Sequence, residues 1–303
     1  MKILITGGAG FIGSHISRIL LDEGHTVLIY DNLFSGHIED IDKRALFLEG
    51  DLKDQKKLKN SLDGVDWVIH MAGFIEVGRS VEDPVGFTDN NVIGSVHLLE
   101  AMREAGVKKI IFSSSACVYG VPEKLPIVEE ERLKSDNPYG ASKIAVEAFC
   151  ETYHNLHGFD VVILRYFNPY GPGENHASET HAIPNFIKNA LAKKPLPVFG
   201  KGELVRDFIY VEDLARAHIA LLKLSGFQIF NVGTEKGSKV NDVINIISDL
   251  LGYDLEVEDL GNRPGDVPKN YASSKKLNKA TGWKSKVSLK QGLEKTIEYF
   301  KEF

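Results

Sequence analysis

Residues 2–14 read KILITGGAGFIGS, an apolar run followed by a glycine-rich turn and the start of a helical pattern. Glycines at positions 7, 10 and 13 allow a tight turn and let a ligand come close to the backbone. The free N–H groups at the start of the following helix favour a phosphate group. The stretch therefore predicts a strand, a phosphate-binding turn and a helix, which together open a dinucleotide-binding fold.

The same alternation continues along the first half of the chain. Apolar runs without polar alternation are typical of strands buried on both faces of a parallel sheet, and helical patterns fill the gaps between them. We therefore expect an α/β fold with a doubly wound parallel sheet. The predicted strands are 2–6, 26–30, 45–48, 65–70, 109–113 and 161–165, and the predicted helices are 14–21, 54–62, 92–105 and 139–156.

After residue 168 the chain is punctuated by Pro and Gly, and the rhythm changes. A helix over 211–224 and a strand over 228–232 are predicted to rejoin the main sheet, whereas helices over 240–251 and 289–303 would build a smaller C-terminal α/β lobe. The expected division is therefore a Rossmann domain and a substrate-binding lobe. The first comprises residues 1–167 plus about 211–232, and the second comprises about 168–210 plus 233–303.

Bulk composition limits the classes of partner. The chain has 303 residues, of which 43% are hydrophobic and 26% charged, and its net charge is −6. An acidic chain does not offer the basic face that a nucleic acid or an anionic membrane requires. Two cysteines, Cys117 and Cys150, argue against a disulfide framework and favour a reducing compartment. No basic leader or long apolar run is present, so we expect a cytoplasmic protein without membrane, nucleic-acid or metal partners.

A carboxylate at the end of the second predicted strand indicates which dinucleotide binds. Asp31 can accept hydrogen bonds from both ribose hydroxyls and would repel a 2′-phosphate, so NAD is predicted rather than NADP. The alternative is that Asp31 is a turn residue before Asn32. The ends of the third and fourth strands fit the same cleft, and His70 is interpreted as a packed strand-end histidine. The segments concerned are Asp51-Leu52 and His70-Met71-Ala72-Gly73.

Tyr139 and Lys143 lie one turn apart on the same face of a predicted helix. Tyr271 and Lys275 repeat the spacing, but only the first pair follows a strand that ends in a run of serines, up to Ser115. A free phenol has a pKa of about 10, which a nearby ammonium and a positive nicotinamide ring would lower. The expected roles are a base for Tyr139, a charged ribose ligand for Lys143 and a proton relay for Ser115.

Taken together, these motifs resemble the extended short-chain dehydrogenase/reductase family, and within it the UDP-glucose (UDP-galactose) 4-epimerases. The resemblance covers nearly the full length of the chain. The stretches that carry it are 7–13, 31–33, 70–73, 77–81, 90–92, 113–120, 137–140, 165–169, 206–210 and 263–266.

The resemblance implies an NAD site and a nucleotide-sugar site, in which arginine forks would match the phosphate oxygens. The residues it implies at NAD are Gly7, Gly10, Phe11, Ile12, Gly13, Asp31, Asn32, Leu33, Ser35, Gly36, Asp51, Leu52, Met71, Ala72, Gly73, Asn91, Ser113, Tyr139, Lys143, Tyr166 and Phe167. Those it implies at the substrate are Ser115, Tyr139, Asn168, His181, Val198, Phe199, Arg206, Arg263, Asp266 and Asn270.

The resemblance also implies a mechanism. Tyr139 would take the proton of the sugar 4-hydroxyl while hydride passes from C4 to NAD, and the 4-keto sugar would turn over before hydride returns to its other face. Asn270 replaces the Tyr of restrictive family members, so N-acetylated UDP-hexoses are expected to fit as well as UDP-glucose and UDP-galactose. A homodimer through helices 92–105 and 139–156 is implied too.

Two residues after Ser115 distinguish the subgroups. The 4,6-dehydratases carry Asp-Glu there, and UDP-glucuronate decarboxylases usually carry Glu at the second position, whereas this chain has Ala116 and Cys117. A 3,5-epimerase that uses Cys117 as an acid or base is one alternative; a small residue in place of Thr is the other interpretation. Ile75 replaces a lysine that contacts the cofactor in several 4-epimerases. A non-catalytic, NAD-binding regulator on the same fold remains the alternative from another class.

Overall fold

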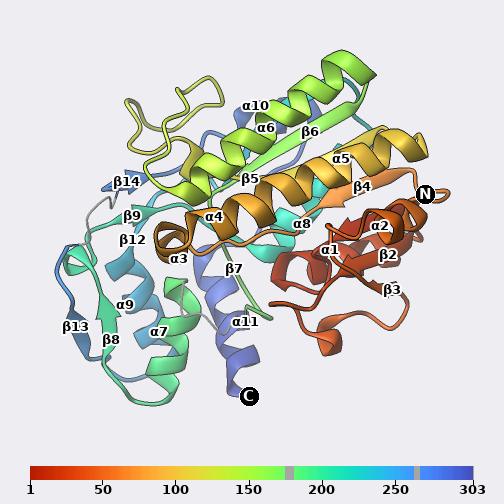
Figure 1. The fold of residues 1–303 in the computed structure, drawn as a ribbon. Helices are drawn as coiled ribbons and strands as arrows, with labels where there is room; N and C mark the ends of the chain where they lie inside the picture. Colours follow the sequence, from red (N-terminus) through yellow and green to blue (C-terminus); the bar gives the residue numbers. More distant parts are fainter. Residues whose placement is uncertain (175–180, 263–266, 303) are drawn as a thin grey trace. The chain divides into compact units, whose positions relative to one another are not determined.

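The structure is a computed structural model, and it describes residues 1–174, 181–262 and 267–302. The chain, whose course is drawn in Figure 1, divides into two compact units. The first unit comprises Met1–Gly120, Leu133–Tyr166 and Ala215–Phe230. The second comprises Val121–Arg132, Phe167–Leu214 and Asn231–Phe303.

A seven-stranded sheet in the order β11-β6-β5-β4-β1-β2-β3 is the framework of the first unit. The pairings from β3 through β6 are parallel. The order reverses between β1 and β4, and sheets of this kind bind ligands beyond the carboxyl ends of the strands at that point. The predicted doubly wound α/β fold is confirmed. The strands are β1 (Lys2–Thr6), β2 (Thr26–Asp31), β3 (Leu46–Glu49), β4 (Trp67–His70), β5 (Lys109–Ser115), β6 (Asp160–Tyr166) and β11 (Phe227–Val232).

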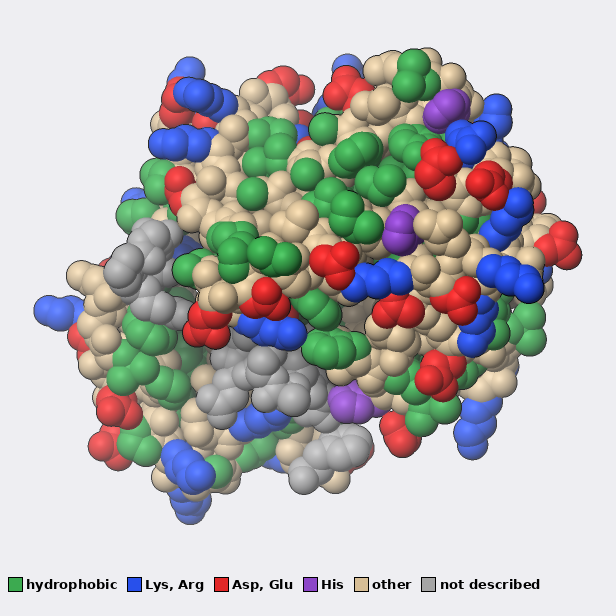
Figure 2. Space-filling model, viewed as in Figure 1, with side chains coloured by type: hydrophobic (Ala, Val, Ile, Leu, Met, Phe, Trp, Pro, Cys, Tyr) green, Lys and Arg blue, Asp and Glu red, His purple; other side chains and the backbone are tan. Residues whose placement is uncertain are grey.

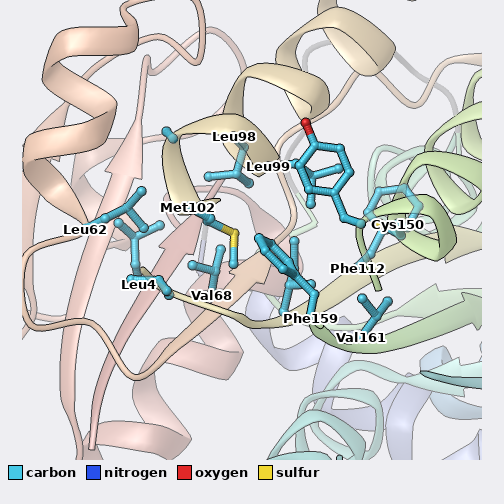
Figure 3. Close-up of a cluster of buried hydrophobic side chains, with 14 of the residues drawn as sticks. Leu4, Leu62, Val68, Leu98, Leu99, Met102, Phe112, Cys150, Phe159 and Val161 are labelled. Carbon is cyan, nitrogen blue, oxygen red and sulfur yellow. The ribbon is translucent and has the colours of Figure 1, made fainter. Parts of the chain in front are cut away.

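Helices α2, α5 and α6 pack together over one face of this sheet, where they bury a large apolar cluster (Figure 3). Each leucine, valine or phenylalanine buried there contributes about 1.5–3 kcal/mol, so α6 is held firmly against β5 and β6. The labelled members are Leu4, Leu62, Val68, Leu98, Leu99, Met102, Phe112, Cys150, Phe159 and Val161. The helices of this part of the chain are α1 (Phe11–Asp22), α2 (Gln55–Ser61), α3 (Val77–Glu82), α4 (Pro84–Phe87), α5 (Gly94–Ala105), α6 (Pro138–His157) and α8 (Val211–Leu221).

The predicted helices and strands form, with ends that shift by a few residues. α1 begins at Phe11 rather than at residue 14, because the glycine-rich turn leads directly into the first helical turn. The predicted helix over 92–105 begins as a π-helix, η2 (Thr88–Ile93), and becomes α5 at Gly94. A π-helical turn is wider than an α-helical one and is frequent at functional sites.

Small sheets and helices form the second unit around a core of its own. The segment Val121–Arg132 belongs here: Ile127 N–H donates to the Tyr271 carbonyl at 2.9 Å, and Ser273 N–H donates to the Ile127 carbonyl at 2.7 Å. The strand groups are β7 (Asn168–Tyr170) with β10 (Phe208–Tyr210), β8 (Leu196–Val198) with β13 (Val257–Asp259), and β12 (Ser238–Lys239), β9 (Val205–Arg206) and β14 (Lys269–Asn270). The helices are α7 (Ala182–Leu191), α9 (Val240–Leu251), α10 (Lys275–Thr281) and α11 (Leu289–Lys301).

None of the helices in the described ranges has the length and apolar character that a bilayer crossing requires. Both cysteines are free thiols. Cys150 is buried in the first core, whereas Cys117 is only partly buried.

Candidate active site

The glycine-rich turn between β1 and α1 leaves no room for side chains. Gly7 has a φ of 70°, and a Cβ there would lie 2.6 Å from the backbone nitrogen of Ala72. A Cβ on Gly13 would lie 2.5 Å from the Gly7 carbonyl oxygen. Helix α1 follows Gly10 directly, so no capping side chain of its own shields the first N–H groups from a phosphate. The turn fits the pyrophosphate of a dinucleotide.

Asp31 ends β2 beside this turn, and its side chain is buried. The carboxylate accepts hydrogen bonds from the N–H groups of Ala9 and Leu33, each at 2.9 Å. Every carboxylate oxygen can accept a second bond, so Asp31 can fix the loop and still bind ribose hydroxyls. A Cβ on Gly36 would lie 2.8 Å from the carbonyl carbon of Ala9. The loop after β2 therefore packs on the glycine-rich turn.

The ends of β3 and β4 add further predicted cofactor residues. Asn32 donates to the Asp51 carboxylate at 2.9 Å. The Asn91 amide oxygen accepts from Phe74 N–H, and its amide nitrogen donates to the Phe74 carbonyl and to the Ser142 hydroxyl. Asn91 therefore holds the loop after β4 against α6. The remaining predicted residues of this group are Phe11 and Ile12 in the first turn of α1, Ser35 after β2, Leu52 after β3, and Met71, Ala72 and Gly73 after β4.

The start of α6 is fixed by local sequence. Asn137 accepts a hydrogen bond from Gly140 N–H at 2.8 Å, and Pro138 occupies the first helical position. Both are preferred residues at these positions, because Asn supplies an acceptor for a free N–H and Pro lacks one. Tyr139 is therefore presented on a well-defined first turn.

The three predicted catalytic residues come together in the first unit. Lys143 Nζ donates to the Ser113 carbonyl at 2.8 Å and lies 5.8 Å from the centre of the Tyr139 ring. Ser115, the last residue of β5, is hydrogen-bonded to the Tyr139 side chain. The later Tyr-x-x-x-Lys copy, which begins at Tyr271, lies in the second unit. Of the two pairs, Tyr139 and Lys143 therefore contact the end of the serine run.

Burial controls the charge of this group. It raises the pKa of Tyr139 above its ordinary value, Cys117 and Glu76 raise it further, and the Ser115 hydrogen bond opposes the change. Burial also lowers the pKa of Lys143 to about 8. The lowered phenol pKa expected from the sequence is therefore not produced by the side chains of the chain itself, because desolvation outweighs the hydrogen bond.

His70 is a packed strand-end histidine, as the sequence indicated. Its Nδ1 lies 2.7 Å from Thr6 Oγ1 and its Nε2 lies 2.8 Å from Ser95 Oγ. Burial, followed by the charge of Lys143, lowers the pKa of His70 to about 3. A neutral imidazole with both nitrogens engaged does not act as an acid or a base near pH 7.

Tyr166, at the end of β6, is buried against the same serines. Its hydroxyl lies 2.5 Å from His218 Nε2 and 3.4 Å from Met71 Sδ. A hydrogen bond with Ser113 links it to the strand that carries the catalytic serine. Phe167, the next predicted cofactor residue, is buried and belongs to the second unit.

Several predicted substrate residues lie on the small strands of the second unit. Arg206 on β9 is aligned with Asn270 on β14. The Arg206 guanidinium donates to the carbonyls of Val205 and Val267 at 2.9 and 2.7 Å, which fixes its direction. The Asn270 side-chain oxygen is buried without a hydrogen-bond partner in the described part of the chain. Such an atom is an acceptor for a ligand donor.

The other predicted substrate residues lie in different surroundings. Asn168 begins β7 and donates to the Asp207 carbonyl. Val198 is buried in the core of the second unit, so its side chain packs rather than faces a ligand. Phe199 follows it, before the turn η4 (Gly200–Gly202). His181 is paired with the Glu174 carboxylate. The predicted Arg263 and Asp266 lie outside the described residues.

Sequence analysis missed two features near Tyr139. Glu147, one turn beyond Lys143, forms a buried ion pair with Arg165 at 2.7 Å. Its spacing from Lys143 was a usable signal, because residues four apart share a helix face. Glu76 contributes negative charge near Tyr139, and no sequence spacing links the two residues.

Comparison with known proteins agrees with this geometry. A model described as the NAD dependent epimerase/dehydratase family matches residues 3–233. The matched range includes the glycine-rich turn, Asp31, Ser115, Tyr139 and Lys143. This chain therefore belongs to the NAD-dependent epimerase/dehydratase family, the extended short-chain dehydrogenase/reductases.

Individual relatives narrow the subgroup. The chain is 39% identical to a UDP-glucose 4-epimerase of Lactobacillus helveticus, over 94% of this chain and 92% of that protein. The chain is also similar to the crystal structure of UDP-glucose 4-epimerase from Thermotoga maritima with UDP-glucose. The sequence identity is 38% and the TM-score is 0.96, and the match covers 100% of this chain and 99% of that one. A UDP-N-acetylglucosamine 4-epimerase from Methanobrevibacter ruminantium, in complex with UDP-N-acetylmuramic acid, is 35% identical, with a TM-score of 0.94 and coverage of 99% and 98%.

Proposed function

We infer that this chain is an NAD-dependent isomerase that inverts C4 of a UDP-hexose through a 4-keto sugar. The observation that carries this inference is the group of Ser115, Tyr139 and Lys143 at the carboxyl end of β5, in the same unit as the glycine-rich turn. Ala116 and Cys117 follow the serine, so the two carboxyl groups that a 4,6-dehydratase carries there are missing. The relatives named above are 4-epimerases of UDP-glucose or UDP-N-acetylglucosamine.

Each side chain of the group has a role in this reaction. The Tyr139 phenolate takes the proton of the 4-hydroxyl and, as the phenol, later returns it, and Ser115 orients that hydroxyl through the hydrogen bond it shares with Tyr139. Lys143 keeps a positive charge beside the phenol below about pH 8, the value of its lowered pKa. NAD, when bound, supplies the hydride acceptor at C4 and a positive ring that favours the phenolate.

The first unit would hold the cofactor. The N–H groups at the start of α1 would face the pyrophosphate, and Asp31 would accept the adenosine ribose hydroxyls. A 2′-phosphate beside the Asp31 carboxylate would be repelled, which favours NAD over NADP. We assign the dinucleotide to this unit and the nucleotide part of the sugar substrate to the second unit, with Arg206 as a ligand of its phosphates.

We further propose that N-acetylated UDP-hexoses are substrates. The buried Asn270 side-chain oxygen can accept the N–H of a 2-acetamido group, and Asn leaves more room than the Tyr of restrictive family members. Asn270→Tyr should abolish turnover of UDP-N-acetylglucosamine and leave UDP-glucose turnover within a fewfold of normal. Equal turnover of the acetamido sugar by both proteins would contradict this role.

The decisive experiment is to incubate the holoenzyme with UDP-glucose, UDP-N-acetylglucosamine and their C4 epimers, and to follow the sugar protons by NMR. Interconversion at C4 without net change in NADH absorbance is expected. A 4-keto-6-deoxy product would indicate a dehydratase, and loss of CO₂ from UDP-glucuronate would indicate a decarboxylase. No conversion of any nucleotide sugar despite bound NAD would favour a regulator.

Replacing Cys117 tests one further alternative, a 3,5-epimerase that uses this thiol. Its charge contributes to the pKa values of both Tyr139 and Lys143, so the thiol is close to the reacting groups. Cys117→Ser should leave C4 inversion largely intact if the thiol only fills space. A near-total loss would favour 3,5-epimerisation with the thiol as an acid or base.

A homodimer in the cytoplasm is the proposed working form. Exposed apolar side chains gather on α3, α4, the end of η2 and α6, which lie side by side in the first unit, and Figure 2 shows hydrophobic side chains over this face. Val85 is 77% exposed and Leu156 is 71% exposed, which is costly for a monomer in water. The residues are Val77, Val81, Val85, Ile93, Phe149 and Leu156, called the apolar face below.

A further inference from the structure

Glu147 is a buried carboxylate on α6, one turn beyond Lys143 and two turns beyond Tyr139. It accepts hydrogen bonds from Arg165 Nε at 3.0 Å and from Arg165 Nη2 at 2.7 Å, which is the strong two-pronged geometry of a carboxylate and a guanidinium. It also accepts one from the Ser114 hydroxyl. Removing a charge from water at this depth is costly unless such partners are present.

The partners of Glu147 come from two neighbouring strands. Ser114 on β5 is aligned with Arg165 on β6 in the parallel pairing. Arg165 Nη1 also donates to the Tyr119 hydroxyl at 2.9 Å, and the guanidinium lies 5.0 Å from the centre of the Tyr119 ring. One carboxylate therefore joins α6 to the ends of β5 and β6 and, through Arg165, to the turn that follows β5.

Glu147 contacts β5 at Ser114, the residue between Ser113 and Ser115. Successive side chains of a strand point to opposite faces, so Ser113 and Ser115 share one face of β5 while Ser114 faces the other. Lys143 is bound to the Ser113 carbonyl, and Tyr139 is bound to Ser115. Glu147 thus holds β5 at Ser114, on the strand face that α6 covers, and Lys143 and Tyr139 on the same helix contact the Ser113 carbonyl and Ser115 at the carboxyl end of the strand.

We propose that Glu147 is a positioning residue for the Tyr139–Lys143 pair, which fixes α6 against β5 and places a negative charge one turn from the Lys143 ammonium. This proposal rests on the proposed roles of Tyr139 and Lys143. Arg165 pairs with Glu147, and the carboxylate stays ionised on the helix that carries the lysine, one turn from it. A neutral side chain of the same shape at position 147 would keep α6 in place but would remove the negative charge near Lys143.

The groups around Lys143 make the sign of the effect clear. Burial lowers the pKa of Lys143 to about 8, and Glu147 followed by Cys117 raises it. His70 faces the ammonium from β4 and is neutral, and the Tyr139 ring lies beside it on α6. Loss of the Glu147 charge therefore lowers the pKa of Lys143, and activity that needs the ammonium should fail at a lower pH.

The test is the pH profile of the holoenzyme for UDP-glucose epimerisation. Glu147→Gln should move the alkaline fall in kcat to lower pH by about one unit, reduce kcat severalfold at pH 8.5, and leave KM within about twofold. Ser114→Ala is the matched control, because it removes a hydrogen bond from the same carboxylate but not its charge. It should reduce kcat at all pH values by the same factor, with no shift of the profile.

A second pair of variants keeps the test valid if Glu147→Gln does not fold. Glu147→Leu combined with Arg165→Met replaces the ion pair by apolar side chains, an exchange that proteins often tolerate. Because it removes the positive charge together with the negative one, it should shift the profile in the same direction but by less than Glu147→Gln does. Asp213→Asn, a buried carboxylate that accepts two backbone N–H bonds in the second unit, controls for general destabilisation.

The outcomes separate this proposal from the assignment of the catalytic pair. Profiles of Glu147→Gln and of the double variant that superimpose on the wild type would overturn the positioning role, as would an equal shift in Asp213→Asn. Full activity of Tyr139→Phe would instead overturn the assignment of the catalytic pair. A shift confined to the Glu147 variants supports both.

Discussion

At the scale of single residues, the chain contains two Tyr-x-x-x-Lys pairs, and we propose that only Tyr139 and Lys143 are catalytic. Tyr139→Phe removes the phenol that moves the proton and should lower kcat by about 10²–10⁴-fold, the usual contribution of a positioned acid or base. Tyr271→Phe is the matched control: it changes the same atom in the second unit and should retain normal turnover. Steady-state kinetics with UDP-galactose, together with NAD content, tests both. Loss of activity in the Tyr271 variant alone would show that the catalytic pair is Tyr271 and Lys275 and that our assignment is wrong.

His70 gives the molecule a predictable response to acid. Its pKa falls from about 6.5 in the unfolded chain to about 3 in the folded chain, so between these values the unfolded state binds the extra proton. Stability therefore decreases as pH falls through this window, by about 1.4 kcal/mol per pH unit from this group. Asn at position 70 cannot titrate. Thermal unfolding between pH 7 and pH 4 should show a shallower loss for His70→Asn than for the wild type; parallel curves would refute the assignment.

That Ser115, Tyr139 and Lys143 lie together was predictable because their signal is local. Tyr139 and Lys143 are four apart in the sequence, and the serine run ends in Ser115, so the chemistry follows from spacing alone. The Glu147–Arg165 pair is different, because it requires knowing that β5 and β6 are neighbours in the sheet. The tyrosine pKa could not be predicted either, since it depends on how deeply α6 is buried.

At the scale of elements, strands whose burial is complete were the easiest to predict. The centres of β1 and β6, residues 3–5 and 161–164, are apolar because helices cover the sheet, and that pattern is visible in the sequence. The two-residue strands β9 and β14 carry no such period, although they place Arg206 beside Asn270. The π-helix η2 was also missed, because its wider turn is set by packing and not by a sequence signal.

The first turn of α6 links an element to the chemistry. Asn137→Ala removes the cap that accepts from Gly140 N–H and should cost about 1 kcal/mol of stability. Because Tyr139 is two residues away, fraying of this turn should also lower kcat severalfold. Ser288→Ala removes the corresponding cap of α11, whose hydroxyl accepts from Gln291 N–H. That variant should lose similar stability in thermal unfolding and keep its kcat; equal losses of activity would refute the link.

At the scale of the whole molecule, the apolar face is the feature that an isolated chain does not explain. A stable dimer buries about 1,200–2,000 Å² in total, and we propose that the exposed side chains of the apolar face form the apolar centre of such an interface. Leu156→Asp combined with Val85→Asp places two charges in that centre, where each would lose its water without gaining a partner. We expect the variant to be a monomer by sedimentation equilibrium at concentrations where the wild type is a dimer.

A control with the same kind of substitution on another surface shows whether loss of the dimer is specific to the apolar face. Leu46→Asp introduces the same charge at a leucine that is 55% exposed on the edge strand β3, away from the apolar face. It should leave the dimer intact, because the aspartate remains in water. Dissociation by both variants would point to a general loss of solubility or fold, and a dimeric double variant would place the contact on another surface. If the dimer forms through this face, α6 contributes Phe149 and Leu156 to the interface and carries Tyr139 and Lys143 as well. The monomeric variant should therefore also lose turnover to the extent that α6 becomes less ordered.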